Sequence, residues 1–269
     1  MLIPSLINPP HVLDLDEDVS LTKAVSQMGR RTLLFDWGAA GERADLDIGG
    51  HVRQLLVPLI EQLGERAALV GYCLGGTMAI AAANFTEVDR VATIAAPWRF
   101  AGYPEASRTS LLELWQSARH AADRLNVLPM EVLQAAFWSL DPHRTVSKFA
   151  RFAELDPESA EARRFVTLED WANEGEPLPL PAARELIEDL FGSDLPGKVA
   201  WNVAGRTMTE KLGVPLLHFT SSQDRITPDT SAAHGARKEI AAGHVGMVVG
   251  SARRQLHEAL AAFLDPACR

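Results

Sequence analysis

The sequence has little cysteine, with only Cys73 and Cys268 among 269 residues. Folds that depend on disulfides carry more cysteines at characteristic spacings, so a disulfide framework is excluded as the basis of this fold. Cys268 is the penultimate residue, where chains are commonly mobile. A thiol that stays free suits a reducing compartment, so we expect a cytoplasmic protein. The sequence gives no reason to expect a metal ion or a cofactor.

The sequence also lacks an excess of positive charge and a long uninterrupted apolar run. The formal net charge is -9, and nucleic-acid binding, which needs a basic face, is therefore not expected. Residues 1–14 lack the basic and apolar regions of a signal peptide. The longest apolar run, residues 67–83, is interrupted by Gly71, Gly75 and Gly76, so we expect no membrane span.

What is present is the composition of a globular protein, with 47% hydrophobic and 23% charged residues. Short apolar runs predict buried strands, and they alternate with amphipathic patterns that predict helices. The strands are expected at 32–35, 67–72, 91–95, 215–219 and 240–242, and the helices at 48–63, 77–85 and 251–264. Strands separated by helices predict an α/β fold with a mostly parallel sheet flanked by helices.

The middle of the chain has a different pattern, because residues 98–212 contain no convincing buried strand. Helical patterns occur there instead, at 111–125, 130–140, 146–155 and 182–191. We interpret 98–212 as a large helical cap inserted between strands of a core formed by 1–97 and 213–269. Such insertions commonly shape substrate access.

The segment Gly71-Tyr72-Cys73-Leu74-Gly75 lies between a predicted strand and a predicted helix. A nucleophile at such a turn points away from the sheet, and glycines allow the strand and helix to approach closely. The helix N-terminus favours a thiolate, and the Leu74 N–H is the natural first donor to an oxyanion. The pattern predicts Cys73 as the nucleophile; the alternative is a small cysteine buried between glycines.

A cysteine nucleophile of this type needs a histidine base and an acid that follow it in the chain. His244, between Gly243 and Val245-Gly246 just past the last predicted strand, suits an imidazole aimed from a loop. Asp224 is the first carboxylate after the preceding strand and is expected to orient His244. The alternatives are a simple turn histidine and an aspartate that caps a helix near Pro228. The other histidines precede Cys73 or lie in cap, strand or polar helical contexts: His11, His51, His120, His143, His218, His234 and His257.

Several motifs together resemble the polyhydroxyalkanoate (poly-3-hydroxybutyrate) synthase family of the α/β-hydrolase superfamily, particularly the shorter catalytic subunit that works with a partner (class III). They occur in the family's order over nearly the whole chain: Pro4-Ser5-Leu6-Ile7-Asn8 to Leu13-Asp14-Leu15, Leu34-Phe35-Asp36-Trp37-Gly38, Gly71-Tyr72-Cys73-Leu74-Gly75-Gly76-Thr77, Leu168-Glu169-Asp170-Trp171-Ala172-Asn173 and Gly243-His244-Val245-Gly246.

The resemblance implies a Cys-His-Asp triad at Cys73, His244 and Asp224, and a hydroxyacyl-coenzyme A thioester as substrate. It also implies a homodimer or a partner subunit. The second oxyanion donor of the family falls on the backbone N–H of Leu6 or Ile7. The chain begins at Met1, where the family has a substantial N-terminal segment. Arg225 stands where the family usually has a histidine, and it could pair with a coenzyme A phosphate or with Asp229.

Three functions are compatible with these residues. The first is an acyltransferase that passes a hydroxyacyl group from coenzyme A to a hydroxyl acceptor, with Trp98 and Tyr103 either lining the acyl entrance or only anchoring the cap. The second uses the same triad with water as the acceptor, as in a thioesterase or esterase. The third is a catalytically inactive subunit that binds a synthase or a polymer granule.

Overall fold

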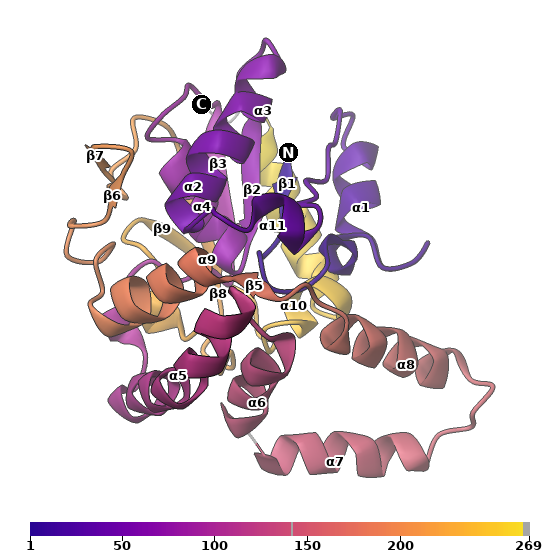
Figure 1. Cartoon of the computed structure of the whole chain (residues 1–269). Helices are drawn as coiled ribbons and strands as arrows, with labels where there is room; N and C mark the ends of the chain where they lie inside the picture. Colours follow the sequence, from indigo (N-terminus) through magenta and orange to yellow (C-terminus); the bar gives the residue numbers. More distant parts are fainter. Residues whose placement is uncertain (141, 266–269) are drawn as a thin grey trace.

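The computed structural model describes residues 1–140 and 142–265, and Cys268 lies outside them. Five parallel strands form the central sheet in the order β1-β2-β3-β8-β9 (Figure 1). Their bounds are β1 Leu2–Ile3, β2 Ala68–Tyr72, β3 Arg90–Ile94, β8 Leu216–Thr220 and β9 Ala236–Glu239. Because the strands are parallel, their carboxyl ends meet at one edge, where functional loops can gather.

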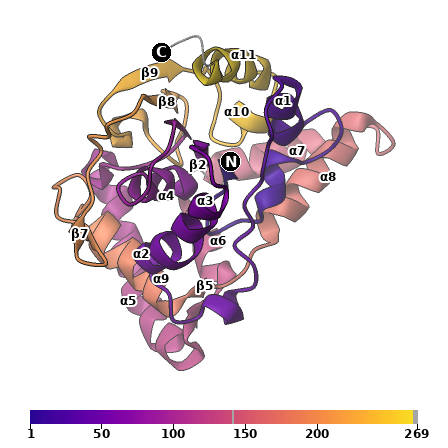
Figure 2. The same ribbon diagram turned by 90° about the horizontal axis from the view of Figure 1, so that it is seen from above.

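Helices cover both faces of this sheet (Figure 2). One face packs against α2 (Ile48–Gly50), η3 (His51–Leu56), α3 (Val57–Gln62) and α4 (Leu74–Ala82). The other packs against α1 (Leu21–Gln27), α10 (Gly246–Val249) and α11 (Arg253–Leu264). The strands divide their side chains between two cores, with Leu69 in the first and Val70 in the second. This alternation explains why the strands are apolar on both faces.

Two predicted strands differ from the observed ones. The expected strand at 32–35 is reduced to a bridge in which Leu34 pairs with Leu2. The last strand is β9, Ala236–Glu239, rather than 240–242. All four β9 residues are exposed, because the strand forms the edge of the sheet. An exposed edge strand has no apolar pattern by which the sequence could have located it.

The region between β3 and β8 forms a largely helical layer over the carboxyl edge of the sheet (Figure 1). Within it, α7 and α8 extend from the body as an arm in which Phe165 stacks on Phe152 and meets Phe149 edge-on. Two short antiparallel pairs, β4-β5 and β6-β7, also occur between β3 and β8, where we expected no convincing buried strand; at two residues each, these strands are too short to show a pattern. The longer elements of this region are α5 Glu105–Leu125, β4 Val127–Leu128, α6 Met130–Leu140, α7 Pro142–Ala153, α8 Ala160–Asn173, β5 Leu178–Pro179, α9 Leu180–Arg184, η5 Glu185–Gly192, β6 Asn202–Val203 and β7 Arg206–Thr207. Single-turn segments of the described chain are η1 Pro10–Leu13, η2 Ala40–Arg43, η4 Phe100–Gly102 and η6 Asp229–Ser231.

Within the described part of the chain, no helix is both long and apolar enough to cross a membrane.

A buried carboxylate joins this helical layer to the core. Glu185, at the start of η5, accepts hydrogen bonds from the backbone N–H of Gly49 (2.9 Å) and from Nε1 of Trp201 (2.6 Å). Burial, assisted by the charge of Asp47, raises the pKa of Glu185 to about 7 despite these donors. The ionised form is therefore unfavourable in the folded protein near neutral pH.

Replacing Glu185 by glutamine is expected to flatten the pH dependence of stability. The folded-state pKa of Glu185 lies above its ordinary value, so its contribution to stability is present below about pH 4.5 and is lost as the pH rises through about 7. In urea unfolding at about pH 5 and about pH 8, the free energy of unfolding of the wild type should fall by roughly 2 kcal/mol more than that of Glu185→Gln. The control is Glu61→Gln, at an exposed position. The same change of unfolding free energy with pH in all three proteins would contradict the prediction.

Candidate active site

Cys73 lies on a sharp turn between the end of β2 and the start of α4. Its backbone angles are φ 54° and ψ -132°, a region that side chains rarely adopt and that functional sites often use. A Cβ atom on Gly71 would lie 2.4 Å from the Cα of Gly76, and one on Gly75 would lie 2.2 Å from the carbonyl oxygen of Ile3. Both glycines are therefore required by the close approach of strand, helix and the segment after β1.

Asp224 and His244 meet at the carboxyl edge of the sheet. His244 donates from Nδ1 to Oδ2 of Asp224 at 2.8 Å, and both side chains are almost completely buried. The other oxygen of Asp224 accepts the backbone N–H groups of Ile226 and Thr227, each at 2.9 Å. The carboxylate is thus fixed by the turn that follows β8, and it fixes the tautomer of the imidazole.

The side chain of Cys73 also interacts electrostatically with the imidazole of His244. Because Nδ1 is occupied by Asp224, Nε2 is the nitrogen left to serve the thiol. Burial opposes protonation of His244, but the charge of Asp224, the charge of Cys73 and the hydrogen bond to Asp224 outweigh it and raise the pKa of His244 to about 10. The Tyr72 ring lies 5.1 Å from the imidazole ring and limits its movement.

The raised pKa of His244 predicts a specific titration. The folded-state pKa of His244 lies above its ordinary value of 6.5. The stability that the protonated His244 adds to the fold is therefore fully present below about pH 6.5 and is lost as the pH rises through about 10. An NMR titration of the imidazole Cε1 signals should show one histidine that stays protonated well above neutral pH, with a loss of unfolding free energy on the order of 1 kcal/mol or more towards pH 10. His244→Gln identifies the signal, and a His244 that titrates near 6.5 would contradict the prediction.

The loop after β1 lies against the nucleophile turn and is held at both ends by tryptophan side chains. Trp37 donates from Nε1 to the carbonyl oxygen of Pro4 (3.2 Å), and Trp171 donates to that of Pro9 (2.9 Å). The Ile7 N–H donates to Oγ of Ser5 at 3.2 Å. Of the two expected oxyanion donors in this loop, Leu6 is therefore the better candidate, since the N–H of Ile7 already has an acceptor.

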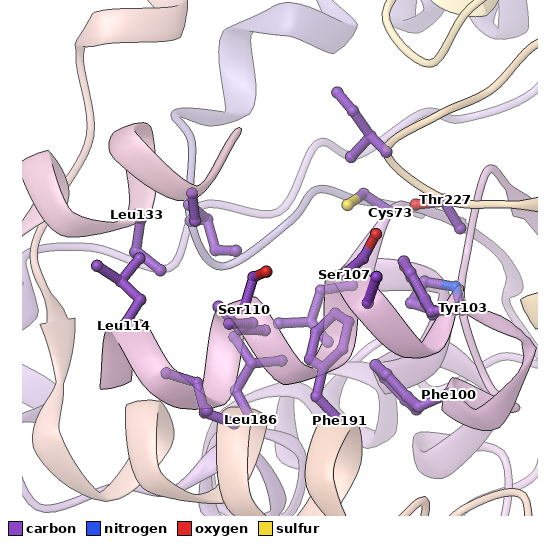
Figure 3. Close-up of a pocket in the computed structure, with 18 residues that line it drawn as sticks. Cys73, Phe100, Tyr103, Ser107, Ser110, Leu114, Leu133, Leu186, Phe191 and Thr227 are labelled. Carbon is purple, nitrogen blue, oxygen red and sulfur yellow. The ribbon is translucent and has the colours of Figure 1, made fainter. Parts of the chain in front are cut away.

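A pocket of about 270 Å³ extends from Cys73 between the core and α5 (Figure 3). Four of the residues expected at the site, Ile7, Cys73, Leu74 and Tyr103, line this pocket. Trp98 does not: it is 1% exposed and packs edge-on against Trp201. Arg225 is exposed beside Asp224 and is also outside the lining.

The hydroxyl groups of this pocket were not predicted from the sequence. Ser107 and Ser110 on α5 and Thr227 after Asp224 all line it. The two serines precede the helix expected at 111–125, whereas α5 begins at Glu105. An acidic residue directly after Pro104 is a helix-start signal that could have placed both on the helix. Within residues 1–140 and 142–265, no cluster of histidine, cysteine, aspartate and glutamate could hold a metal ion.

Sequence comparisons agree with this architecture. The model of the alpha/beta hydrolase family matches residues 19–259. The "Poly(3-hydroxyalkanoate) polymerase subunit PhaC" of Haloferax mediterranei is 26% identical over 93% of this chain and 55% of its own length. The protein of that name from Allochromatium vinosum is 25% identical over 98% of this chain and 80% of its own. The chain thus spans little more than half the length of the Haloferax relative.

Solved structures share the fold at low identity. An extracellular alpha/beta-hydrolase from a Paenibacillus species has a TM-score of 0.57 at 14% identity and covers 97% of this chain and 96% of its own. A monoacylglycerol lipase from Paleococcus ferrophilus has a TM-score of 0.55 at 15% identity, covering 98% and 92%. The predicted fold class and the resemblance are both confirmed: the chain belongs to the alpha/beta hydrolase family and is similar in sequence to poly(3-hydroxyalkanoate) polymerase subunits.

Proposed function

We propose that this protein is an acyltransferase that takes a hydroxyacyl group from a coenzyme A thioester onto Cys73 and passes it to a hydroxyl acceptor. The observation that carries the proposal is the grouping of three side chains, in which His244 donates to Asp224 and interacts electrostatically with Cys73 on its strained turn. The relatives named as poly(3-hydroxyalkanoate) polymerase subunits supply the substrate class.

In the first half-reaction, Nε2 of His244 holds the proton that the Cys73 thiol has given up, in keeping with the raised pKa of His244. The thiolate attacks the thioester carbonyl carbon, and the oxyanion is stabilised by the Leu74 N–H at the start of α4 and by the Leu6 N–H. The bond from the carbonyl carbon to the coenzyme A sulfur then breaks, and the imidazolium returns its proton to the departing thiolate. Asp224 stabilises the imidazolium, in keeping with the raised pKa of His244.

In the second half-reaction, the acceptor hydroxyl gives its proton to Nε2 of His244 as its oxygen attacks the acyl-enzyme. The bond to the sulfur of Cys73 breaks, and Cys73 is released as a thiolate beside the imidazolium, which keeps the proton from the acceptor. The product is an ester, and repetition with the terminal hydroxyl of that ester lengthens a polyester. Water in place of the hydroxyl would give hydrolysis by the same steps.

Mass spectrometry of the protein after brief exposure to 3-hydroxybutyryl-coenzyme A tests this function. We expect the acyl mass on the peptide that contains Cys73, release of one coenzyme A thiol per acyl group, and esters of the acyl unit as later products. Free hydroxybutyrate as the sole product would assign the site to a hydrolase. A protein that never becomes acylated would overturn the proposal.

Removing one anchor of the loop after β1 should slow acylation. In Trp171→Phe the bond to the carbonyl oxygen of Pro9 is lost, and we expect roughly a tenfold lower acylation rate because Leu6 is held less firmly. The matched control is Trp115→Phe, which removes an indole bond to Glu188 in the helical layer (2.7 Å). The role of the loop would be contradicted if both variants lost similar stability, by urea unfolding, and acylated equally fast.

A further inference from the structure

The pocket beside Cys73 has a polar end and an apolar end. Hydroxyl groups of Thr227, Tyr103 and Ser107 lie at the Cys73 end (Figure 3). Leu114 and Leu133 lie at the opposite end. A ligand that fills the pocket therefore carries its polar groups near the reacting carbonyl and plain hydrocarbon farther away.

Helix α5 sets the length of the pocket. Ser107, Ser110, Leu111 and Leu114 are spaced at three, four and seven residues and so share one face of the helix. At a rise of about 1.5 Å per residue, this face runs roughly 10 Å from Ser107 to Leu114. The lining thus changes from hydroxyl to hydrocarbon along a single helix.

Part of the pocket wall is buried and part of it is exposed. Leu133, at the far end, and Leu186 are each 5% exposed and Ile187 is 2% exposed, whereas Leu114 is half-buried. Ala106 and Ser110, by contrast, are exposed members of the lining. If each non-hydrogen atom needs about the 30 Å³ that a water molecule occupies in the liquid, a volume of 270 Å³ accepts on the order of nine such atoms, or about seven carbons and two oxygens of a 3-hydroxyacyl group.

We propose that the acyl group for which this pocket is built is a 3-hydroxyacyl chain of medium length, about six to eight carbons, whose end lies against Leu114 and Leu133. This inference rests on the proposed function, because it places the thioester carbonyl at Cys73. The carbonyl and the 3-hydroxyl occupy the polar end, where Ser107 and Thr227 can hydrogen-bond the hydroxyl. The remaining carbons lie along the apolar face of α5, where a four-carbon substrate, with about six of the nine non-hydrogen atoms, would leave roughly the distal third of the pocket unfilled.

The test compares kcat/KM for 3-hydroxyacyl-coenzyme A thioesters of four, eight and ten carbons by thiol release. Burial of each methylene can contribute about fourfold, so we expect the wild type to favour eight carbons over four by at least about tenfold. Leu114→Phe should lower this ratio at least tenfold by shortening the pocket. Leu133→Ala should raise the ratio of ten to four carbons by making it longer. Leu125→Phe, at the exposed end of the same helix, is the matched control and should leave both ratios unchanged.

The outcomes separate this inference from the proposed function. If the four-carbon thioester acylates Cys73 and the eight-carbon thioester reacts equally well or less well, the proposed chain length is wrong but the proposed acyltransferase function is not affected. If neither pocket variant changes the ratios of kcat/KM between chain lengths, the acyl chain does not lie along α5. A Cys73 that no thioester acylates would overturn the proposed function and the chain length together.

Discussion

Replacing Cys73 by alanine is expected to abolish acyl transfer, with a fall in rate of at least about 10⁴-fold, because no other group can form the acyl-enzyme. Alanine should be tolerated at this position without a change of the backbone. Ala95 already adopts a positive φ of 49° elsewhere in this chain, so the turn can be retained without the sulfur. Thiol release from hydroxyacyl-coenzyme A should fall to the background rate, and the protein should keep its unfolding midpoint in urea.

Two further proteins make the result specific to Cys73. Cys268→Ala leaves one thiol in the chain and should transfer acyl groups at the wild-type rate. Cys73→Ser keeps the shape of the side chain but replaces a thiol with a much weaker nucleophile, so it should transfer at well under one hundredth of that rate. Turnover retained by Cys73→Ala would remove the basis of both the acyltransferase and the hydrolase interpretation.

The central part of this site was predictable from sequence because its signals are local. Gly71 and Gly75 flank Cys73 on a strand-turn-helix segment, and the close contacts around both glycines explain why larger residues cannot stand there. Asp224 and His244 follow from the order of strands, since loops after parallel strands meet at one edge. Their 2.8 Å hydrogen bond agrees with that expectation, whereas the catalytic roles remain predictions.

The supporting contacts were not predictable, because they join residues far apart in the chain. Trp171 donates to Pro9 across 162 positions, and no local pattern pairs the two. Both Trp37 and Trp171 belong to motifs that carried the family resemblance, but only the fold shows that they hold the same loop. Glu185 is a similar case, since it is one of three acidic residues in η5, and nothing in the sequence marks it as the one that accepts from a buried indole and a buried amide.

Replacing Asp224 by asparagine is expected to be nearly as damaging as loss of the nucleophile, although the fold should hardly change. An asparagine Oδ1 can still accept the N–H groups of Ile226 and Thr227, which the aspartate binds at 2.9 Å. The atom that replaces Oδ2 is an NH₂ group, which cannot accept from Nδ1 of His244. The imidazole then favours the other tautomer, in which Nε2 carries a hydrogen and cannot take the proton of Cys73.

This tautomer change should lower the acylation rate by about 10³ to 10⁴-fold. It should also lower the pKa of His244 from about 10, because the charge of Asp224 is the largest of the effects that raise it. Asp194→Asn is the matched control: Asp194 is a buried carboxylate whose Oδ1 accepts from the Phe100 N–H at 2.7 Å, and its φ of 50° suits asparagine. The Asp194→Asn protein should become acylated at nearly the wild-type rate. An Asp224→Asn protein that acylates within tenfold of wild type, with His244 still protonated at high pH, would show that the carboxylate neither orients nor charges the base.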